Sequence, residues 1–329
     1  MTPVAPRSPI VFKVRCLEPD IRLRVFHTEF HVSSVILKMN SAFFAKYLDS
    51  PDKPTMESST PEFKYEWASR VDRDGSWSLH AVSSNRSSDN YPEALRGRPS
   101  YHIQLFHKFL SAIHGESYKI GNVAQLRGLT DLADYYCALP AVSKSVLQPL
   151  LENRLNVRDN SAALISIATK LRHKILFQEA AMFLAGYWGG EYWFKPDTKH
   201  LDVLVPELRE VIITARAAMA FSIASAFQIL LTHKNRVPIV ALQLSRYETD
   251  SDAPNVADVF RCIYQGCDPS IEEEVEVMVM LSDLKDNRIL LDSGSVQPTQ
   301  NGERDYKDYF LCFQISDDDL PWDCTQKDF

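Results

Sequence analysis

The spacing of apolar residues changes along this chain, and that change restricts the fold more than any other feature. Before residue 83, apolar side chains recur at every second position, as at Ile21, Leu23 and Val25. This pattern is typical of half-buried β-strands. From Tyr101 onward they recur every three or four positions, which is typical of amphipathic helices. Strands that come first and helices that follow predict an α+β protein.

The N-terminal part is expected to form a small sheet with two short helices inserted in it. Ser33 and Ser41 each precede a short helix, and we expect their side chains to cap it. A turn ending in Gly75, where φ can be positive, joins the last two strands. The polar residues 83–99 predict a loop insert. The expected strands are residues 10–15, 21–25, 30–32, 63–71 and 76–82.

The rest of the chain is expected to be helical in the middle and to end in a small antiparallel β region. The 21 residues Val211–Leu231 are mostly apolar and long enough to cross a bilayer. They contain Arg216 and lack a flanking aromatic belt, so we expect a helix largely buried in the protein. Alternating or apolar runs predict the C-terminal strands, at residues 275–281, 288–291 and 309–316.

Charge and period together divide the 329 residues into three regions. These are an N-terminal domain at 1–155, a helical region at 156–246 and an acidic region at 247–329. The acidic region holds 6 basic and 20 acidic residues, so its charge of −14 outweighs a positive remainder and leaves the chain at −7. This acidity disfavours direct contact with nucleic acid or an anionic membrane, and suits a protein partner that is basic.

Cysteine usage and the start of the chain bear on the compartment. The six cysteines form no C-x-x-C pair, which fits free thiols in a reducing compartment. The first nine residues hold three prolines and lack the apolar stretch of a secretory signal. We therefore expect an intracellular protein, either cytoplasmic or nuclear.

The sequence contains no recognisable catalytic, cofactor-binding or metal-ligating pattern. Its nine histidines do not fall into a zinc-binding spacing. Four aromatic residues around the glycines at 186–190 can stack on a sugar or a base, but we interpret them as core side chains. They are Tyr187, Trp188, Tyr192 and Trp193. We expect a protein that is not an enzyme and that carries no cofactor and no metal.

Several segments of residues 1–155 resemble the signature of the BTB/POZ domain. Asp20–Val25, Glu29–Leu37 and Ser41–Phe44 are similar to its first strand, the entry to its first helix and its Phe-Phe helix. Phe109–Tyr118 and Leu129–Tyr136 look like two of its later segments. The resemblance implies an N-terminal BTB/POZ-like α/β domain.

The remainder of the chain is similar to a group of filamentous-fungal BTB proteins. The shared features are a long hairpin insert at 63–82, a helical region after the BTB/POZ domain and a closing segment at Asp317–Asp323. This second resemblance implies one architecture for the whole chain, in which a BTB/POZ-like domain precedes a helical C-terminal part.

Two departures from the family pattern limit what the resemblance implies. Members linked to zinc fingers form a charged corepressor pocket from an aspartate and a basic residue. Here Asp20 is present, but Ser34 replaces the basic residue. Cullin-binding members carry an apolar-x-Glu element after the Phe-Phe helix. The nearest match is Thr55-Met56-Glu57, with Thr in the apolar position.

The resemblance implies a non-enzymatic protein–protein interaction module or scaffold. The helix faces next to the expected interaction residues can form a homodimer. Two alternatives stay open: a substrate adaptor of a cullin-type ubiquitin ligase, with Met56 and Glu57 on the cullin, and a transcriptional or chromatin regulator without direct DNA contact. The expected interaction residues are Met39, Phe43, Phe44, Tyr47, Met56 and Glu57.

Overall fold

The computed structural model shows a mixed α+β protein, which confirms the fold class expected from the sequence. The chain divides into two compact units. The first comprises Met1–Pro149 with Lys327–Phe329, and the second comprises Leu150–Gln326. The residues that the structure describes are 8–49, 63–82, 92–152, 155–188, 201–249, 255–292 and 306–329.

The first unit contains a five-stranded mixed sheet in the order β1-β3-β2-β4-β5. β2 pairs antiparallel with β3 and parallel with β4, so Leu23 lies beside both Phe30 and Trp67. All three side chains are buried, which gives the sheet one apolar face. The strands are β1 (Ile10–Val11), β2 (Ile21–Val25), β3 (Thr28–Val32), β4 (Tyr65–Val71) and β5 (Trp77–Ala81).

The predicted hairpins of this sheet are confirmed, with changes at their ends. Gly75 has a φ of +83° in the β4–β5 turn, which confirms the positive φ expected at the glycine that ends this turn. The first strand is shorter than expected and stops at Val11. The β2–β3 turn is reached through Phe26, whose φ is +52°, an unusual value for a residue with a side chain.

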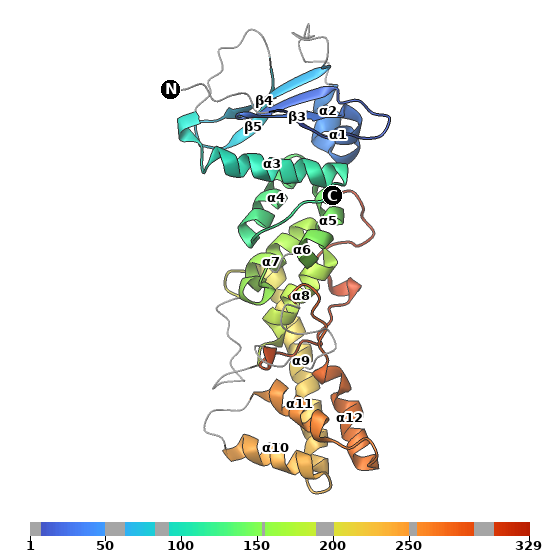
Figure 1. The fold of residues 1–329 in the computed structure, drawn as a ribbon. Coiled ribbons are helices and arrows are strands. Elements are labelled where there is room, and N and C mark those ends of the chain that lie inside the picture. Colours follow the sequence, from blue (N-terminus) through green and yellow to red (C-terminus); the bar gives the residue numbers. More distant parts are fainter. Residues whose placement is uncertain are drawn as a thin grey trace. The chain divides into compact units, whose positions relative to one another are not determined.

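Helices pack on the apolar face of the sheet and connect its strands (Figure 1). Phe106 of α3 meets Phe30 of β3 with ring centroids 5.6 Å apart, and both rings are fully buried. The helical elements of this part are α1 (Ser34–Asn40), α2 (Ala42–Leu48), the 3-10 turn η1 (Pro92–Ala94), α3 (Pro99–His114), α4 (Val123–Tyr135), α5 (Leu139–Ser145) and α6 (Leu147–Glu152).

One of the two predicted serine caps is wrong and the other is confirmed. Ser33 precedes α1, but its side chain makes no capping bond. Instead Asp20 caps the helix, because its two carboxylate oxygens accept from the Ser34 N–H and hydroxyl at 2.6 Å each. Ser41 does cap α2 by accepting from the Phe44 N–H at 3.2 Å. A distant carboxylate thus took a role that local spacing assigned to Ser33.

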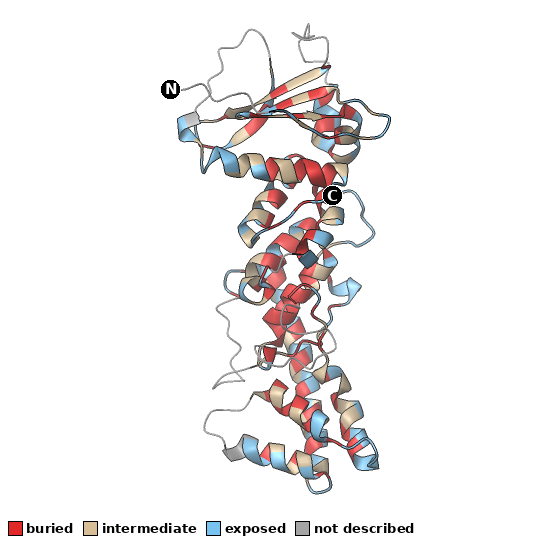
Figure 2. Ribbon diagram, in the orientation of Figure 1, coloured by how far each residue is buried: buried red, intermediate tan, exposed pale blue. Residues whose placement is uncertain are grey.

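The described residues of the second unit are mostly helical, with irregular segments at 201–205 and between 286 and 326. A continuous core joins four helices through Met219, Leu230, Val240, Phe260 and Leu281. In Figure 2 single helices carry both buried and exposed positions, as amphipathic helices do. The helices are α7 (Val157–Leu171), α8 (Lys174–Gly186), α9 (Pro206–His233), α10 (Pro238–Thr249), α11 (Val256–Gly266) and α12 (Glu272–Lys285), followed by the 3-10 turn η3 (Asp317–Asp319).

The predicted C-terminal antiparallel β region is wrong for the described residues. Residues 275–281 lie inside α12, and 288–291 form no strand. Within 309–316 the structure has one isolated bridge, between Tyr187 and Tyr309. Val277, Leu281 and Leu284 also recur at helical spacing, and they are the residues that α12 buries. Packing against α9 and α11 therefore outweighed the alternating valines.

The apolar helix α9 is less buried than the sequence suggested. It buries one stripe, which includes Ile212, Met219 and Ile223, but Ile213 and Phe221 are 51% and 75% exposed. Only 28% of its most apolar window is buried, because its packing partners α8 and α12 leave much of its surface uncovered. By length and composition alone α9 passes as a membrane span, a weak test that core helices of soluble proteins also pass.

Candidate functional site

The most exposed apolar side chains of the first unit belong to its short helices. Met39 on α1 is 75% exposed and Tyr47 on α2 is 41% exposed. Val35, one turn before Met39, and Tyr135, at the end of α4, are 45% and 53% exposed. We refer to these four exposed residues of α1, α2 and the end of α4 together as the α1–α2 surface. None of the four side chains is acidic or basic.

The two phenylalanines expected at an interface have different roles. Phe44 is fully buried and stacks on Tyr136, with centroids 5.4 Å apart and planes 3° from parallel. Phe43 is half-buried and contacts Tyr47 at 4.8 Å and Tyr135 at 6.0 Å. Phe44 is therefore a core residue, whereas Phe43 supports the two exposed tyrosines from below.

Hydrogen-bonded polar side chains lie next to this surface, at the end of α2. Lys38 bonds Asp49 at 2.6 Å, and the Tyr65 hydroxyl donates to the same carboxylate at 2.5 Å. The bond from Lys38, followed by that from Tyr65, lowers the pKa of Asp49. Apolar side chains beside a hydrogen-bonded polar edge are the usual composition of a protein interface.

The sequence pattern missed two members of the surface and proposed two residues that lie elsewhere. Val35 and Tyr135 were not among the interaction residues expected from the sequence. The exposed position of Tyr135 follows once Tyr136 is taken as the inward ring of that helix end. Met56 and Glu57 lie outside the described residues.

Asp20 and Ser34, which the sequence compared with a charged pocket, contact each other directly in the structure. Ser34 does not merely lack a charge, since it donates two hydrogen bonds to Asp20. The carboxylate thereby becomes part of the start of α1. A basic replacement at Ser34 would lose the hydroxyl bond to Asp20 but would keep the bond from its backbone N–H.

Charged residues buried in the second unit hold irregular backbone rather than forming an open site. Glu179 on α8 is 1% exposed and accepts from the N–H groups of Leu290, Leu291 and Asp292 at 2.8, 2.8 and 2.7 Å. Arg261 on α11 is 4% exposed and donates to the carbonyls of Tyr306, Lys307 and Tyr309. Burial lowers the pKa of Arg261 to about 10.

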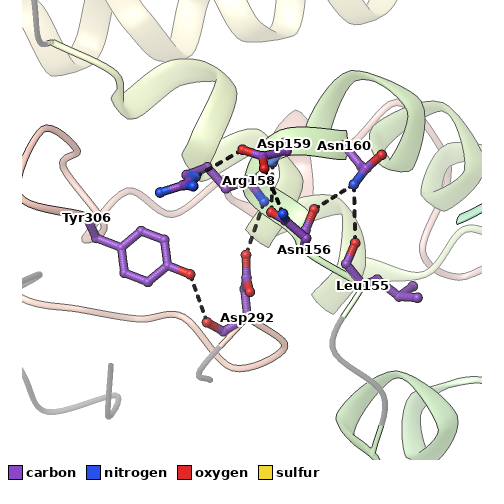
Figure 3. Close-up of polar contacts among 7 residues, drawn as sticks. All are labelled: Leu155, Asn156, Arg158, Asp159, Asn160, Asp292 and Tyr306. Atoms are coloured by element: carbon purple, nitrogen blue, oxygen red, sulfur yellow. Dashed lines mark hydrogen bonds and ion pairs between the residues drawn. The ribbon is translucent and has the colours of Figure 1, made fainter. Parts of the chain in front are cut away.

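The start of α7 is a second polar centre (Figure 3). The Asp292 carboxylate accepts from the Arg158 N–H at 3.2 Å, and the Tyr306 hydroxyl donates to the Asp292 carbonyl at 3.1 Å. Asn156 accepts from the Asp159 N–H at 3.2 Å, which caps the helix. Since these groups bond to one another, they act as a joint between α7 and the segment that contains Asp292.

The aromatic residues near Gly186 are partly outside the described chain. Tyr187 packs on Tyr309 at 5.0 Å and the Trp188 indole donates to the Ala185 carbonyl, as core side chains do. Tyr192 and Trp193 lie outside the described residues. No group of three or more His, Cys, Asp or Glu side chains in the described part of the chain is placed to hold a metal ion.

Comparison with known proteins does not extend these findings. No family model, no curated protein and no solved structure matches this chain.

Proposed function

We propose that this chain is a non-enzymatic protein-interaction module or scaffold that pairs with a second copy of itself through the α1–α2 surface. The observation that carries the proposal is the exposure of Met39 on α1 and of Tyr135 at the end of α4, at 75% and 53%. Large exposed apolar and aromatic side chains on ordered elements are typical binding residues.

The order of elements supports a BTB/POZ-like domain in residues 1–155. The antiparallel hairpin β2–β3 leads into α1 and α2, and α3, α4 and α5 follow the β4–β5 insert. This is the order implied by the sequence resemblance. The insert joins the sheet through a parallel pairing of β4 with β2.

The charge of the surface favours a second copy as the occupant. In a two-fold symmetric interface each patch meets itself, so any charge in its centre would meet an equal charge. The four members of the α1–α2 surface carry no charge, and the Lys46 ammonium group lies 5.5 Å from the centre of the Tyr47 ring. A symmetric pairing would therefore keep the two Lys46 side chains at its rim. The ion pair of Lys38 with Asp49 lies at its edge and satisfies itself.

The test is the mass of the full chain in solution, measured by light scattering during size exclusion. We expect a dimer for the natural sequence, and a monomer for Met39→Glu and for Tyr135→Glu, because each places an unpaired charge in the interface. Val279→Glu is the matched control, since Val279 is 68% exposed on α12 and should leave the dimer intact. Circular dichroism verifies that the variants fold.

Two results would overturn this proposal. One is a natural protein that stays monomeric at every concentration measured. The other is a dimer that both surface variants leave unchanged, which would put the interface elsewhere. Capture of a cullin by the monomeric protein would instead support the adaptor function, in which Met56 and Glu57 are the expected contacts.

A further inference from the structure

A hollow of about 350 Å³ lies at one end of the sheet in the first unit. Arg24, Phe26 and His27 line it from the end of β2, Ser69 lines it from β4, and Pro99 lines it from the start of α3. Small-molecule sites in proteins begin at about this volume. The hollow therefore has room for one compact ligand.

The hollow exists because two parallel strands separate. β2 and β4 run side by side up to the pairing of Arg24 with Ala68. After this point β2 turns back through Phe26 into β3, while β4 continues to Val71. The Phe26 N–H donates to the Ser69 hydroxyl oxygen at 2.8 Å, which fixes the turn at the mouth of the opening.

The polar side chains that line the hollow are hydrogen-bond donors without an internal acceptor. Arg24 and His27 are exposed, and neither has a hydrogen bond or an ion pair with another described residue. Glu29 lies opposite Arg24 across the strands, but its carboxylate bonds His31 at 2.6 Å. The Ser69 hydroxyl accepts from Phe26 and donates to no described group.

The start of α3 adds positive potential to the same place. Pro99 is the first residue of this 16-residue helix, and its first turn holds no acidic side chain. The N-cap residue is Arg98, which makes no capping bond and adds another cation. The N-terminal end of a helix carries roughly half a positive elementary charge. An anion in the hollow would face this end as well as Arg24 and His27.

One wall of the hollow is aromatic. Phe26 packs against Trp77 and His102, with centroids 5.3 and 6.1 Å apart, so its ring is held in place. A ligand with an anionic head and an apolar or ring-shaped body would use both kinds of wall. We propose that this hollow binds a phosphate monoester, with the phosphoryl oxygens on Arg24, His27 and the Ser69 hydroxyl. The inference does not depend on the proposed self-association.

The test is titration of the full chain by calorimetry, at low salt, with inorganic phosphate, phenyl phosphate and a phosphoserine peptide. We expect saturable binding, with phenyl phosphate tighter than inorganic phosphate because it also covers the Phe26 ring. Arg24→Gln and His27→Gln should each weaken binding by about tenfold, since a charge-assisted bond to the phosphoryl group is lost. Tight binding of the peptide alone would identify a phosphorylated protein as the source of the ligand.

Arg127→Gln is the matched control, because Arg127 is an exposed arginine of the same unit that does not line the hollow. Its affinity for phenyl phosphate should equal that of the natural chain. The site is overturned if none of the three probes binds saturably, or if Arg24→Gln and Arg127→Gln bind equally well. Arg24 is exposed, so its replacement should leave the melting temperature unchanged and keep the result interpretable.

Discussion

The N-terminal ends of α7 and α3 differ in whether acceptor side chains of the chain itself bond to them. At α7 the chain supplies its own acceptors: Asn156 caps the helix, Asp159 lies in the first turn, and Asp292 accepts from the Arg158 N–H (Figure 3). At α3 the cap position is Arg98, and no acid follows it in the first turn. At the start of α7, carboxylates of the chain offset the positive end of the helix. The start of α3 lacks such a carboxylate and lies beside the hollow lined by Pro99.

This difference separates a structural joint from a candidate binding site. Both ends carry the positive end of a helix dipole, although α3 begins with Pro99 and so lacks the N–H group that Val157 supplies to α7. Where a carboxylate of the same chain occupies the position, a ligand has nothing to bind. Glu179 extends the comparison, since it occupies a set of three backbone N–H groups that would otherwise attract an anion.

The largest expected effect on stability comes from removing the Glu179 carboxylate. Glu179→Ala leaves three N–H groups without their acceptor, and we expect it to destabilise the segment around 290–292 by about 3 kcal/mol. Hydrogen exchange of the Leu290, Leu291 and Asp292 amides measures this directly. Exchange as slow as in the natural chain would show that the carboxylate does not hold this segment.

Removing the cap of α7 should have a smaller effect. Asn156 has a φ of +48°, so Asn156→Ala loses the cap and also strains the backbone. We expect a loss of about 1 kcal/mol or slightly more at the start of α7, read from exchange of the Arg158 and Asp159 amides. Asn156→Gly tolerates the backbone angle and isolates the capping term. Equal exchange in all three proteins would mean that Asp292 alone secures this end.

A substitution that gives α3 an acidic capping side chain should make its start resemble that of α7. Arg98→Asp supplies a capping side chain and a favourable charge, and we expect the first unit to gain about 0.5–1 kcal/mol. The same change should weaken phenyl phosphate binding, because the new carboxylate repels the phosphoryl group. Arg98→Ala separates loss of the arginine from gain of the acid. A more stable variant with unchanged phosphate affinity would contradict a role for the helix end.

The smallest expected effect is a dependence on pH that originates at Glu179. Burial raises the pKa of this carboxyl group, against the opposing effect of its three N–H donors. A raised folded-state pKa contributes stability below the unfolded-state value, and this contribution is lost as pH rises through the folded-state pKa. In denaturant unfolding, the natural chain should therefore lose stability relative to Glu179→Gln as pH rises. A natural chain that instead gains stability relative to Glu179→Gln would indicate a lowered pKa.

The sequence predicted the hairpins well because their signals are local. Alternation at Ile21, Leu23 and Val25 and the glycine at 75 act within a few residues, and both survive in the folded chain. Met39 and Tyr47 were expected at an interface because of the family resemblance, and both side chains are exposed. Tyr135 was missed because its exposure depends on how Tyr136 packs against Phe44 and Phe109.

Long-range partners decided the rest. Asp20 replaced Ser33 as the cap of α1 across a separation of 14 residues, and α12 became a helix because α9 and α11 offered it an apolar groove rather than a strand partner. The role of Glu179 could not be predicted from its apolar run, because the N–H groups that donate to its carboxylate lie more than 100 residues away. The sequence by itself determined the mixed fold class and the hairpins, because period and turn chemistry are short-range. Only the tertiary structure decided which charges are satisfied internally, because that depends on which distant segments meet.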